Sequence, residues 1–420
     1  MIHKPIALVL GGTNPHIYLI ENLKARGFFT VLIDYYDNPP AKYVADQHIK
    51  ESTLDKEKVL AISISMKVSL VISLCIDQAN TTACYVAEKL ELPKPYSYET
   101  ALNVTNKGLM KHLMIENNIP TSKHIYIQSV SEFFDSGLNF PVVVKPADSN
   151  GSVGVRKANS EIEFLKYVEE AKEISRTGKV IIEEFVEGIE ISIDCFVKDK
   201  KTEIILIRQK LELLKEKENV LQSTGSFSPG NISELALARI QKVVNSLPLI
   251  FNFDNTPLLV QAFLDGDNIS IIEFAPRISG GLSLRTIQLN TGFDILDSAI
   301  DHYLGINSKI EFTKANSYVA TIIIYAIPGI FDRITGYQKL IEDNIIENFY
   351  PYKTKGMQIG GDMSTRSRIG AFIVKSANKK ELNQKIQSAI DTLEVFDNHG
   401  KKIMRKDIYK KLDSDNSIIP

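Results

Sequence analysis

A lysine at the end of an apolar strand, followed by a glycine-rich loop, is the first chemically informative feature of this sequence. The run FPVVVKPADSNGSVGV, residues 140–155, contains Lys145 and then Ser149, Gly151, Ser152 and Gly154. A lysine at a strand end can bind a polyphosphate, and the backbone N–H groups of a Gly/Ser loop can close over the same oxygens. The run is not a Walker loop, because no Gly-Lys-Ser/Thr follows the glycines. It predicts a phosphate site of another kind.

Acidic residues gather in a second segment, IIEEFVEGIE at residues 181–190. Two interpretations of this cluster are a solvated strand edge and a set of carboxylates that face a cleft. The flanking apolar residues follow a strand pattern, which favours an inward or cleft-facing position for Glu190. A third segment, QAFLDGDNISIIEFAPRISGG at residues 261–281, has Glu273 at a strand end and Arg277 just beyond it. The three segments give the phosphate hypothesis its weight, because each alone is a weak signal.

The first hundred residues must form a parallel, doubly wound α/β sheet, because short apolar strands alternate with helical segments. The expected strands and helices are Ile6–Leu10, His16–Arg26, Val31–Ile33, Val68–Leu74 and Gln78–Leu90. We interpret Gly11-Gly12 as a strand-to-helix turn, because GGTNPH lacks the GxGxxG spacing of dinucleotide-binding turns. His16 and Asp34 share the carboxyl edge of this sheet, where contact with a substrate is the alternative interpretation.

Pro93 and Pro95 mark a boundary, after which mixed strands and helices predict an α+β region. Its expected elements are a helix at 106–117, strands at 142–145, 180–184, 189–197 and 203–209, and a hairpin of 257–263 with 269–274. The segment Leu211–Val220 is rich in Leu, Glu and Lys and is expected to be a helix or a mobile loop. A third piece begins near Ser317, with strands at 320–326 and 369–374.

Composition excludes several classes of protein. The 420 residues are 44% hydrophobic and 24% charged, as in an ordinary globular protein of two or three domains. The net charge of −2 gives no reason to expect nucleic acid or an anionic membrane as partner. Three cysteines form neither a disulfide framework nor a zinc motif, and we expect them to be reduced. The apolar start is too short for a signal peptide, and no run approaches the ~18 residues that span a bilayer. We therefore expect a cytoplasmic protein without membrane partners.

In this order, TNKGLMKHL and the three segments above resemble the ATP-grasp superfamily of carboxylate–amine or carboxylate–thiol ligases. The resemblance covers nearly the whole chain and is closest to bacterial L-amino-acid ligases (dipeptide synthetases), with similarity to biotin carboxylase and the carbamoyl-phosphate synthetase large subunit. It implies an α/β and α+β ATP-grasp fold. A Rossmann-like pre-grasp domain would occupy 1–95, the ATP-grasp domain 96–310 with a hinge near 183–187, and a C-terminal α+β lobe 311–420.

The resemblance also implies a nucleotide site. Lys107 and Lys145 would contact the phosphates of ATP, and the loop Ser149–Gly154 would be a lid over them. Adenine would be read by the backbone of Glu184 and Val186, with Glu183 near its exocyclic amine. Glu190 would bind the ribose, with Glu187 as second choice. A lysine in the first turn of a helix is poorly placed against the helix dipole, which favours a phosphate role for Lys107 over mere exposure. We interpret Lys111, one turn later, as solvent-exposed.

The metal motif departs from the family pattern, which has Glu, then Glu-x-Asn-x-Arg about a dozen residues later. Here the matching residues are Gln261, Glu273, Ala275 and Arg277. The resemblance implies that Gln261 and Glu273 bind Mg²⁺, or Mn²⁺ in its place, with a weakened second metal. A surface ion pair is the alternative for Glu273.

At the reacting end, Arg277 would face the γ-phosphate or an acyl-phosphate. Ser279, Gly280 and Gly281 would offer backbone amides to a carboxylate or oxyanion. Arg285 would hold a substrate carboxylate, with a structural salt bridge as its alternative, and Arg208 is a lesser phosphate candidate.

The activity implied is an ATP-dependent ligation: a carboxylate becomes an acyl-phosphate, an amine attacks it, and ADP and phosphate leave. The partners would be a small-molecule carboxylate and amine, most plainly two amino acids, and a homodimer is common among relatives. No Ser/His/Asp or Cys/His arrangement suggests a nucleophile, and we interpret His302 as structural. Two alternatives stay open. One is a carboxylase or carbamoyl-phosphate-like enzyme that uses bicarbonate; the other is a non-catalytic nucleotide-binding protein, suggested by Gln261 and Ala275.

Overall fold

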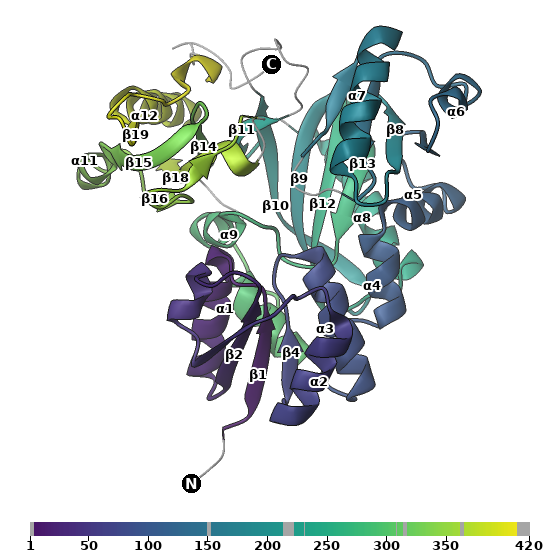
Figure 1. The fold of residues 1–420 in the computed structure, drawn as a ribbon, viewed down its shortest axis with the longest axis vertical. Coiled ribbons are helices and arrows are strands. Elements are labelled where there is room, and N and C mark those ends of the chain that lie inside the picture. The colour runs from purple at the N-terminus through teal and green to yellow at the C-terminus, as the bar shows by residue number, and fades with distance from the viewer. Residues whose placement is uncertain are drawn as a thin grey trace.

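The computed structural model of the protein describes residues 4–148, 153–212, 222–230, 232–307, 309–313, 317–361 and 365–409. In this part of the chain, helices pack on sheets of four, four, eight and three strands. Figure 1 shows the N-terminal sheet below and the other sheets above it, with the small sheet and the C-terminal strands on opposite sides.

The N-terminal sheet is parallel, with strand order β3-β2-β1-β4. Its strands are β1 (Ile6–Leu10), β2 (Phe29–Asp34), β3 (Gln47–Lys50) and β4 (Leu70–Ile72). Helix α1 (Asn14–Ala25) packs on the face that contains Ala7 and Val9. Helices α2 (Lys56–Met66) and α3 (Asp77–Lys89) pack on the face that contains Leu8 and Leu10. Both faces are covered, which explains the unbroken apolar runs and confirms the doubly wound prediction.

A small antiparallel sheet carries the lysine-ended strand, in the order β5-β8-β6-β7. Its strands are β5 (His124–Ile127), β6 (Val142–Pro146), β7 (Arg156–Ala158) and β8 (Val180–Glu184). Helix α7 (Glu161–Ile174) packs on it, and Ser160 caps the helix by accepting a hydrogen bond from the N–H of Glu163. Pairing sets Glu183 of β8 opposite Val143 of β6. Lys145 lies two residues after Val143, on the same face of the sheet.

The largest sheet has eight strands in the order β13-β12-β9-β10-β11-β14-β18-β16, all antiparallel. They are β9 (Ile189–Lys198), β10 (Lys201–Glu212), β11 (Ser223–Ser228), β12 (Thr256–Asp265), β13 (Asn268–Ala275), β14 (Tyr318–Tyr325), β16 (Asn348–Pro351) and β18 (Arg368–Ser376). The hairpin β12–β13 confirms the sequence prediction. The third piece of the chain is continuous with the second, because β14 pairs with β11.

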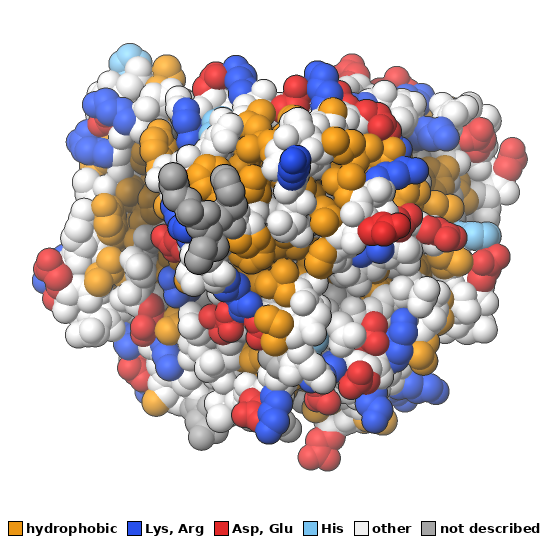
Figure 2. All heavy atoms as spheres, turned by 90° about the horizontal axis from the view of Figure 1, so that it is seen from below, with side chains coloured by type: hydrophobic (Ala, Val, Ile, Leu, Met, Phe, Trp, Pro, Cys, Tyr) orange, Lys and Arg blue, Asp and Glu red, His pale blue; other side chains and the backbone are white. Residues whose placement is uncertain are grey.

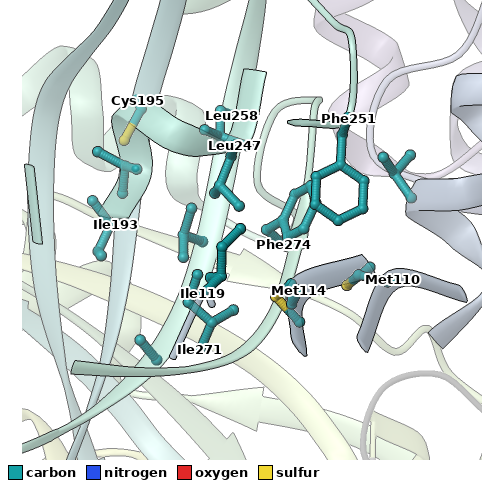
Figure 3. Packing of buried hydrophobic residues seen from close by; sticks show 14 of the residues in the cluster. Met110, Met114, Ile119, Ile193, Cys195, Leu247, Phe251, Leu258, Ile271 and Phe274 are labelled. Atoms are coloured by element: carbon teal, nitrogen blue, oxygen red, sulfur yellow. The ribbon is translucent and has the colours of Figure 1, made fainter. Parts of the chain in front are cut away.

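An apolar core fixes the helix that presents Lys107. Figure 3 shows Met110 and Met114 beside Phe251, Phe274 and Ile271. The methionines belong to α5 (Lys107–Glu116), and the core joins α5 to helix α8 (Glu234–Ile250) and strands β9, β12 and β13. Burial of such side chains contributes ~1.5–3 kcal/mol each, so the first turn of α5 is held firmly against the large sheet.

The remaining elements complete the shell. The helices are α4 (Tyr98–Thr105), α6 (Ser131–Phe134), α9 (Ser283–Thr291), α10 (Ile295–Tyr303), α11 (Tyr337–Glu342) and α12 (Lys379–Thr392), with 3₁₀ turns at Pro40–Tyr43, Thr365–Ser367 and Lys406–Ile408. The strands β15 (Gly329–Thr335), β17 (Gln358–Ile359) and β19 (Glu394–Asp397) form the three-stranded sheet. The predicted segment Leu211–Val220 lies outside the described residues from 213 onward.

Across the described ranges, none of the helices combines the length and apolar character needed to cross a bilayer. Figure 2 shows one face, on which hydrophobic side chains gather near the middle and charged side chains of both signs surround them. On this face, basic side chains do not form a separate patch.

Candidate active site

The predicted residues converge on one cavity of about 610 Å³, which is lined by the N-terminal end of α3, the first turns of α5, the small sheet and the large sheet. The predicted site residues that line it are Lys107, Lys145, Glu183, Glu184, Val186, Glu190, Gln261, Glu273, Arg277, Ser279, Gly280 and Gly281. Segments that lie far apart in the sequence therefore meet here.

A buried cluster of three charges lies at the small-sheet wall. Glu183 accepts contacts from the ammonium groups of Lys145 and Lys111, the latter at 3.2 Å, and all three side chains are less than a tenth exposed. Lys111 also donates hydrogen bonds to the hydroxyls of Thr121 and Ser122, at 3.1 and 2.8 Å. The cluster carries two positive charges and one negative charge, so the wall is net positive beside the cavity.

The cluster shifts the pKa of two of its members. Burial opposes ionisation of Glu183, but the charges of Lys145 and Lys111 outweigh it and lower its pKa to about 2. Burial lowers the pKa of Lys111 to about 8, although Glu183 favours its charged form. The prediction that Lys111 is solvent-exposed is wrong. The residue sits on the inner side of α5, and its charge is compensated by a glutamate 72 positions later in the chain.

Beyond this cluster the cavity becomes apolar. Phe185 and Val186 follow the end of β8, and Met110, Val143, Val155, Phe263 and Ile272 also line the cavity. The ammonium of Lys157 lies 3.8 Å from the centre of the Phe185 ring. A flat apolar ring can be enclosed between such side chains, while the backbone after Glu184 offers polar groups at its edge.

Glu190 faces the cavity from the start of β9, as its flanking pattern predicted. Its carboxylate pairs with the ammonium of Lys210 on β10 at 2.9 Å. Lys210, which the sequence analysis did not single out, also lines the cavity.

Gln261 and Glu273 lie directly opposite each other on the antiparallel strands β12 and β13. The ammonium of Lys107 lies 3.4 Å from Glu273 and lowers the pKa of that carboxyl group. In turn, burial opposes the charge of Lys107, but Glu273 and Glu183 outweigh it and raise its pKa. Glu273 therefore already holds a cation at its carboxylate, and its side chain is still 41% exposed.

One carboxylate and one amide oxygen form a sparse donor set for a metal. Within the described residues, no group of three or more His, Cys, Asp or Glu side chains could hold a metal ion. Mg²⁺ often takes only one or two protein ligands and completes its shell with waters and substrate phosphates. The pair fits that mode of binding, and it does not fit a metal held by protein ligands alone.

Arg277 lines the cavity, yet its guanidinium is engaged by Asp77 in a two-pronged ion pair. One nitrogen donates to Asp77 Oδ2 at 2.8 Å, Nε donates to Oδ1 at 2.5 Å, and a third nitrogen donates to the carbonyl of Ile278 at 2.9 Å. Burial opposes its charge, but Asp77 outweighs this and raises the pKa of Arg277. Asp77 begins α3 after strand β4, at the carboxyl edge of a parallel sheet, where ligands commonly bind. Its position directly after a predicted strand of a parallel sheet is the sequence signal that could have identified Asp77.

Two predicted arginines have other contacts. The guanidinium of Arg208 lies against the buried carboxylate of Asp194, which also accepts a hydrogen bond from Ser279. Arg208 lines the cavity with its charge already compensated. Arg285 is not among the residues that line the cavity; its guanidinium lies 4.5 Å from the ring centre of Tyr18 and donates to Gln288 at 3.1 Å. The structure does not bring Arg285 together with the other site residues.

The glycine-rich loop is described in part. Ser149, Gly151 and Ser152 lie outside the described residues. Gly154 has a φ of +74°, and a Cβ atom there would lie 2.7 Å from Ile174 and 2.9 Å from Pro146. The chain thus requires glycine where the loop rejoins the small sheet.

Two other predicted residues at this edge of the N-terminal sheet, Asp34 and His16, make internal contacts. Asp34 accepts the N–H of Gly12 at 2.7 Å, and His16 is fully buried beside Thr13. Neither residue is among those that line the cavity. His302, as predicted, has a structural environment: its ring contacts Phe196 and the carbonyl of Ser298.

Residues 138–285 match the family model described as an ATP-grasp domain. The chain carries an ATP-grasp domain. The matched span begins just before β6 and ends within α9, so it contains Lys145, the segment 183–187 and the Gln261–Glu273 pair.

The curated relatives that the chain matches are distant. It is 25% identical over 346 residues to a phosphoribosylamine–glycine ligase of Pyrococcus furiosus, covering 77% of this chain and 76% of that protein. It is 23% identical to a formate-dependent phosphoribosylglycinamide formyltransferase of Haemophilus ducreyi, covering 64% and 68%. It is also 23% identical over 234 residues to the carbamoyl phosphate synthase large chain of Clostridium acetobutylicum, covering 53% of this chain and 21% of that protein. The chain thus spans only about a fifth of the carbamoyl phosphate synthase large chain.

Solved structures show the same fold over nearly the whole chain. An L-amino acid ligase from Bacillus licheniformis superposes with a TM-score of 0.77 at 18% identity, covering 94% of this chain and 99% of that one. The biotin carboxylase domain of a Hydrogenobacter thermophilus 2-oxoglutarate carboxylase, a dimer in complex with MgADP, ADP and bicarbonate, gives 0.71 at 16% identity, covering 97% and 93%. The predicted ATP-grasp fold is confirmed.

Proposed function

We propose that the protein is an ATP-dependent carboxylate–amine ligase, which activates a carboxylate as an acyl-phosphate and couples it to an amine with release of ADP and phosphate. The observation that carries the proposal is the single cavity that contains Lys107, Lys145, Glu273 and Arg277. A protein that only binds nucleotide has no need of an arginine and an oxygen-ligand pair beyond the phosphate lysines. The similarity to a phosphoribosylamine–glycine ligase and to an L-amino acid ligase supports the same reaction class.

At the nucleotide end, we assign adenine to the apolar segment near Val186 and the ribose to Glu190. Lys145 and Lys107 would bind phosphate oxygens as point charges, because each lines the cavity from an element that an apolar core fixes. Glu183 would keep Lys145 in place from behind. We propose residues 1–95, 96–310 with a hinge near 183–187, and 311–420 as the functional divisions.

At the reacting end, Gln261 and Glu273 would hold Mg²⁺, or Mn²⁺, through their oxygens. A metal held by these two residues would supply neutralising charge beside the phosphates. Arg277, already oriented by Asp77, would direct guanidinium donors at the transferred phosphoryl group or the acyl-phosphate. The turn Ser279–Gly281 lines the same end and would offer its amides to the oxyanion.

The test is phosphate release from ATP and Mg²⁺ across single amino acids, amino-acid pairs, simple amines and bicarbonate, with product masses recorded. Release that requires an acid and an amine, with the mass of their condensation product, supports the ligase. Phosphate release that requires bicarbonate would identify bicarbonate, and not an amino acid, as the acid substrate. ATP binding without any release would leave a nucleotide-binding protein.

A variant series separates the metal site from general damage. Glu273→Ala should lower turnover by at least about 100-fold, because the site loses its carboxylate. Glu203→Ala is the matched control, since Glu203 is an exposed strand glutamate outside the cavity. Equal activity of the two variants would contradict the metal assignment.

We also propose a homodimer in the cytoplasm. The Hydrogenobacter relative is described as a dimer, and the three free cysteines of this chain suit a reducing compartment. Light scattering should give a mass near twice 47.1 kDa, and a monomer mass would contradict the dimer.

A further inference from the structure

Six cationic side chains line the cavity in the described part of the chain, and five of them already face a carboxylate. The pairs are Lys107 with Glu273, Lys145 with Glu183, Arg208 with Asp194, Lys210 with Glu190, and Arg277 with Asp77. The sixth cation is Arg368. Across the described ranges no carboxylate pairs with it, so its charge is the one that these residues leave uncompensated.

Arg368 begins β18, and its guanidinium is oriented by neutral groups. Nε donates to the hydroxyl of Tyr325 at 3.2 Å, and a terminal nitrogen donates to the amide oxygen of Gln222 at 3.3 Å. These bonds hold the plane of the guanidinium without neutralising it. A partly buried cation of this kind gains stability from an anion in the cavity.

Tyr352 lines the cavity together with Arg368. Burial raises the pKa of its hydroxyl to about 12, against the opposing effect of Arg368, so the hydroxyl stays neutral and can donate. Within the described residues this hydroxyl has no hydrogen-bond partner. A guanidinium and a hydroxyl donor on one wall form a suitable site for a carboxylate or a phosphate.

This wall is distant from the metal pair along the large sheet. Strands β9, β10, β11 and β14 lie between β12, which carries Gln261, and β18. Each strand adds about 4.8 Å. A carboxylate activated beside Glu273 is therefore a different group from an anion bound at Arg368.

We propose that Arg368 and Tyr352 bind a second, terminal anionic group, a carboxylate or a phosphate, on one of the two substrates that are ligated. The inference rests on the proposed function, because it treats the cavity as a ligation site. It names a class of substrate that the reaction type alone does not specify: one substrate is an acid or an amine with an additional negative charge at its far end.

The test compares matched substrates that differ at the far end, glutamine with glutamate and serine with phosphoserine. Wild-type protein should favour the anionic member by roughly 10- to 100-fold in kcat/KM, the range that a charge-assisted hydrogen bond supplies. Arg368→Gln should raise KM for the anionic member by a similar factor, with little change in kcat or in the Kd for ATP. Tyr352→Phe should have a smaller effect in the same direction. Arg366→Gln is the control, because Arg366 is exposed and does not line the cavity.

Equal loss for neutral and anionic substrates in Arg368→Gln would overturn the inference, and so would the absence of a preference in the wild-type protein. If no substrate is turned over, binding of glutarate and glycerol phosphate is measured by calorimetry in the presence of ADP. Binding that Arg368→Gln abolishes and Arg366→Gln retains would support the anion site while the ligase proposal fails. Equal binding to both variants, or none to the wild-type protein, would overturn it. The probe that binds distinguishes carboxylate from phosphate.

Discussion

The proposed nucleotide end of the cavity and its C-terminal end differ in how their cationic side chains are paired. At the nucleotide end, Lys145 and Lys107 each rest against a glutamate, so their charges are compensated before any ligand arrives. At the C-terminal end, Arg368 donates to a hydroxyl and an amide oxygen and lies 6.0 Å from the ring centre of Tyr325, and within the described residues it has no carboxylate partner. A lysine that is already paired with a glutamate gains less from an added anion, whereas an arginine without a carboxylate partner favours ligands that carry an anion. The first arrangement suits a cofactor common to many enzymes, and the second suits a specific substrate.

The largest effect is expected when the carboxylate of Glu183, which pairs with Lys145 and Lys111, is removed. Glu183→Gln would leave two buried lysines without a counter-charge, and we expect a loss of about 3–5 kcal/mol in the free energy of unfolding, measured by urea denaturation. Glu184→Gln, at the exposed neighbouring position, should change stability by no more than about 0.5 kcal/mol. Similar losses for both variants would mean that the cluster does not stabilise the fold.

Acid should lower the free energy of unfolding by protonating Glu183. The pKa of Glu183 in the folded protein, about 2, lies below its ordinary value of 4.5, so its contribution is complete above pH 4.5 and is lost as the pH falls toward 2. Since each unit of pKa corresponds to 1.36 kcal/mol, the loss is about 3 kcal/mol. We expect the unfolding free energy of wild-type protein to fall by this amount more than that of Glu183→Gln over the same pH range. Parallel pH curves for the two proteins would contradict the shift.

Variants of Asp77 test whether this carboxylate also orients the guanidinium of Arg277 for the reaction. Asp77→Asn should lower kcat by roughly 10- to 100-fold while the Kd for ATP changes little, because the guanidinium of Arg277 keeps its charge and loses its two-pronged partner. Asp77→Glu should recover part of the rate. A loss confined to ATP binding, or no recovery with glutamate, would assign Asp77 a merely structural role.

The smallest effect is expected at the metal pair. Gln261→Glu places a second carboxylate opposite Glu273, and we expect the Mg²⁺ concentration for half-maximal activity to fall by roughly 3- to 10-fold. Titration of activity with Mg²⁺ at fixed ATP measures it. A higher Mg²⁺ requirement would show that the amide is not a metal ligand.

The sequence indicates the residues of the proposed nucleotide end because its signals there are local. Lys145 is the residue before the last one of its own strand, and Gln261 lies opposite Glu273 in a short hairpin. The contacts it does not predict join distant positions: Arg277 meets Asp77 across 200 residues, and Arg368 meets Gln222 across 146. Lys111 was misjudged for the same reason, since its partner Glu183 lies on another element. The guanidinium of Arg285 packs on the ring of Tyr18 of α1, and no residue near Arg285 in the sequence indicates this contact.

The continuous sheet from β12 to β18 has a mechanical consequence. Hydrogen-bonded neighbours fix both the metal pair and Arg368 to one backbone lattice, so the span between them cannot adjust to a longer or shorter molecule. The small sheet is a separate sheet, joined to the large one through the segment after Glu184 and through the hydrogen bond from the Thr121 hydroxyl to the carbonyl of Ile271. If the proposed substrate spans the pair Gln261–Glu273 and Arg368, the large sheet fixes the length that it must have, and a compound one or two bonds too short would reach only one of the two sites.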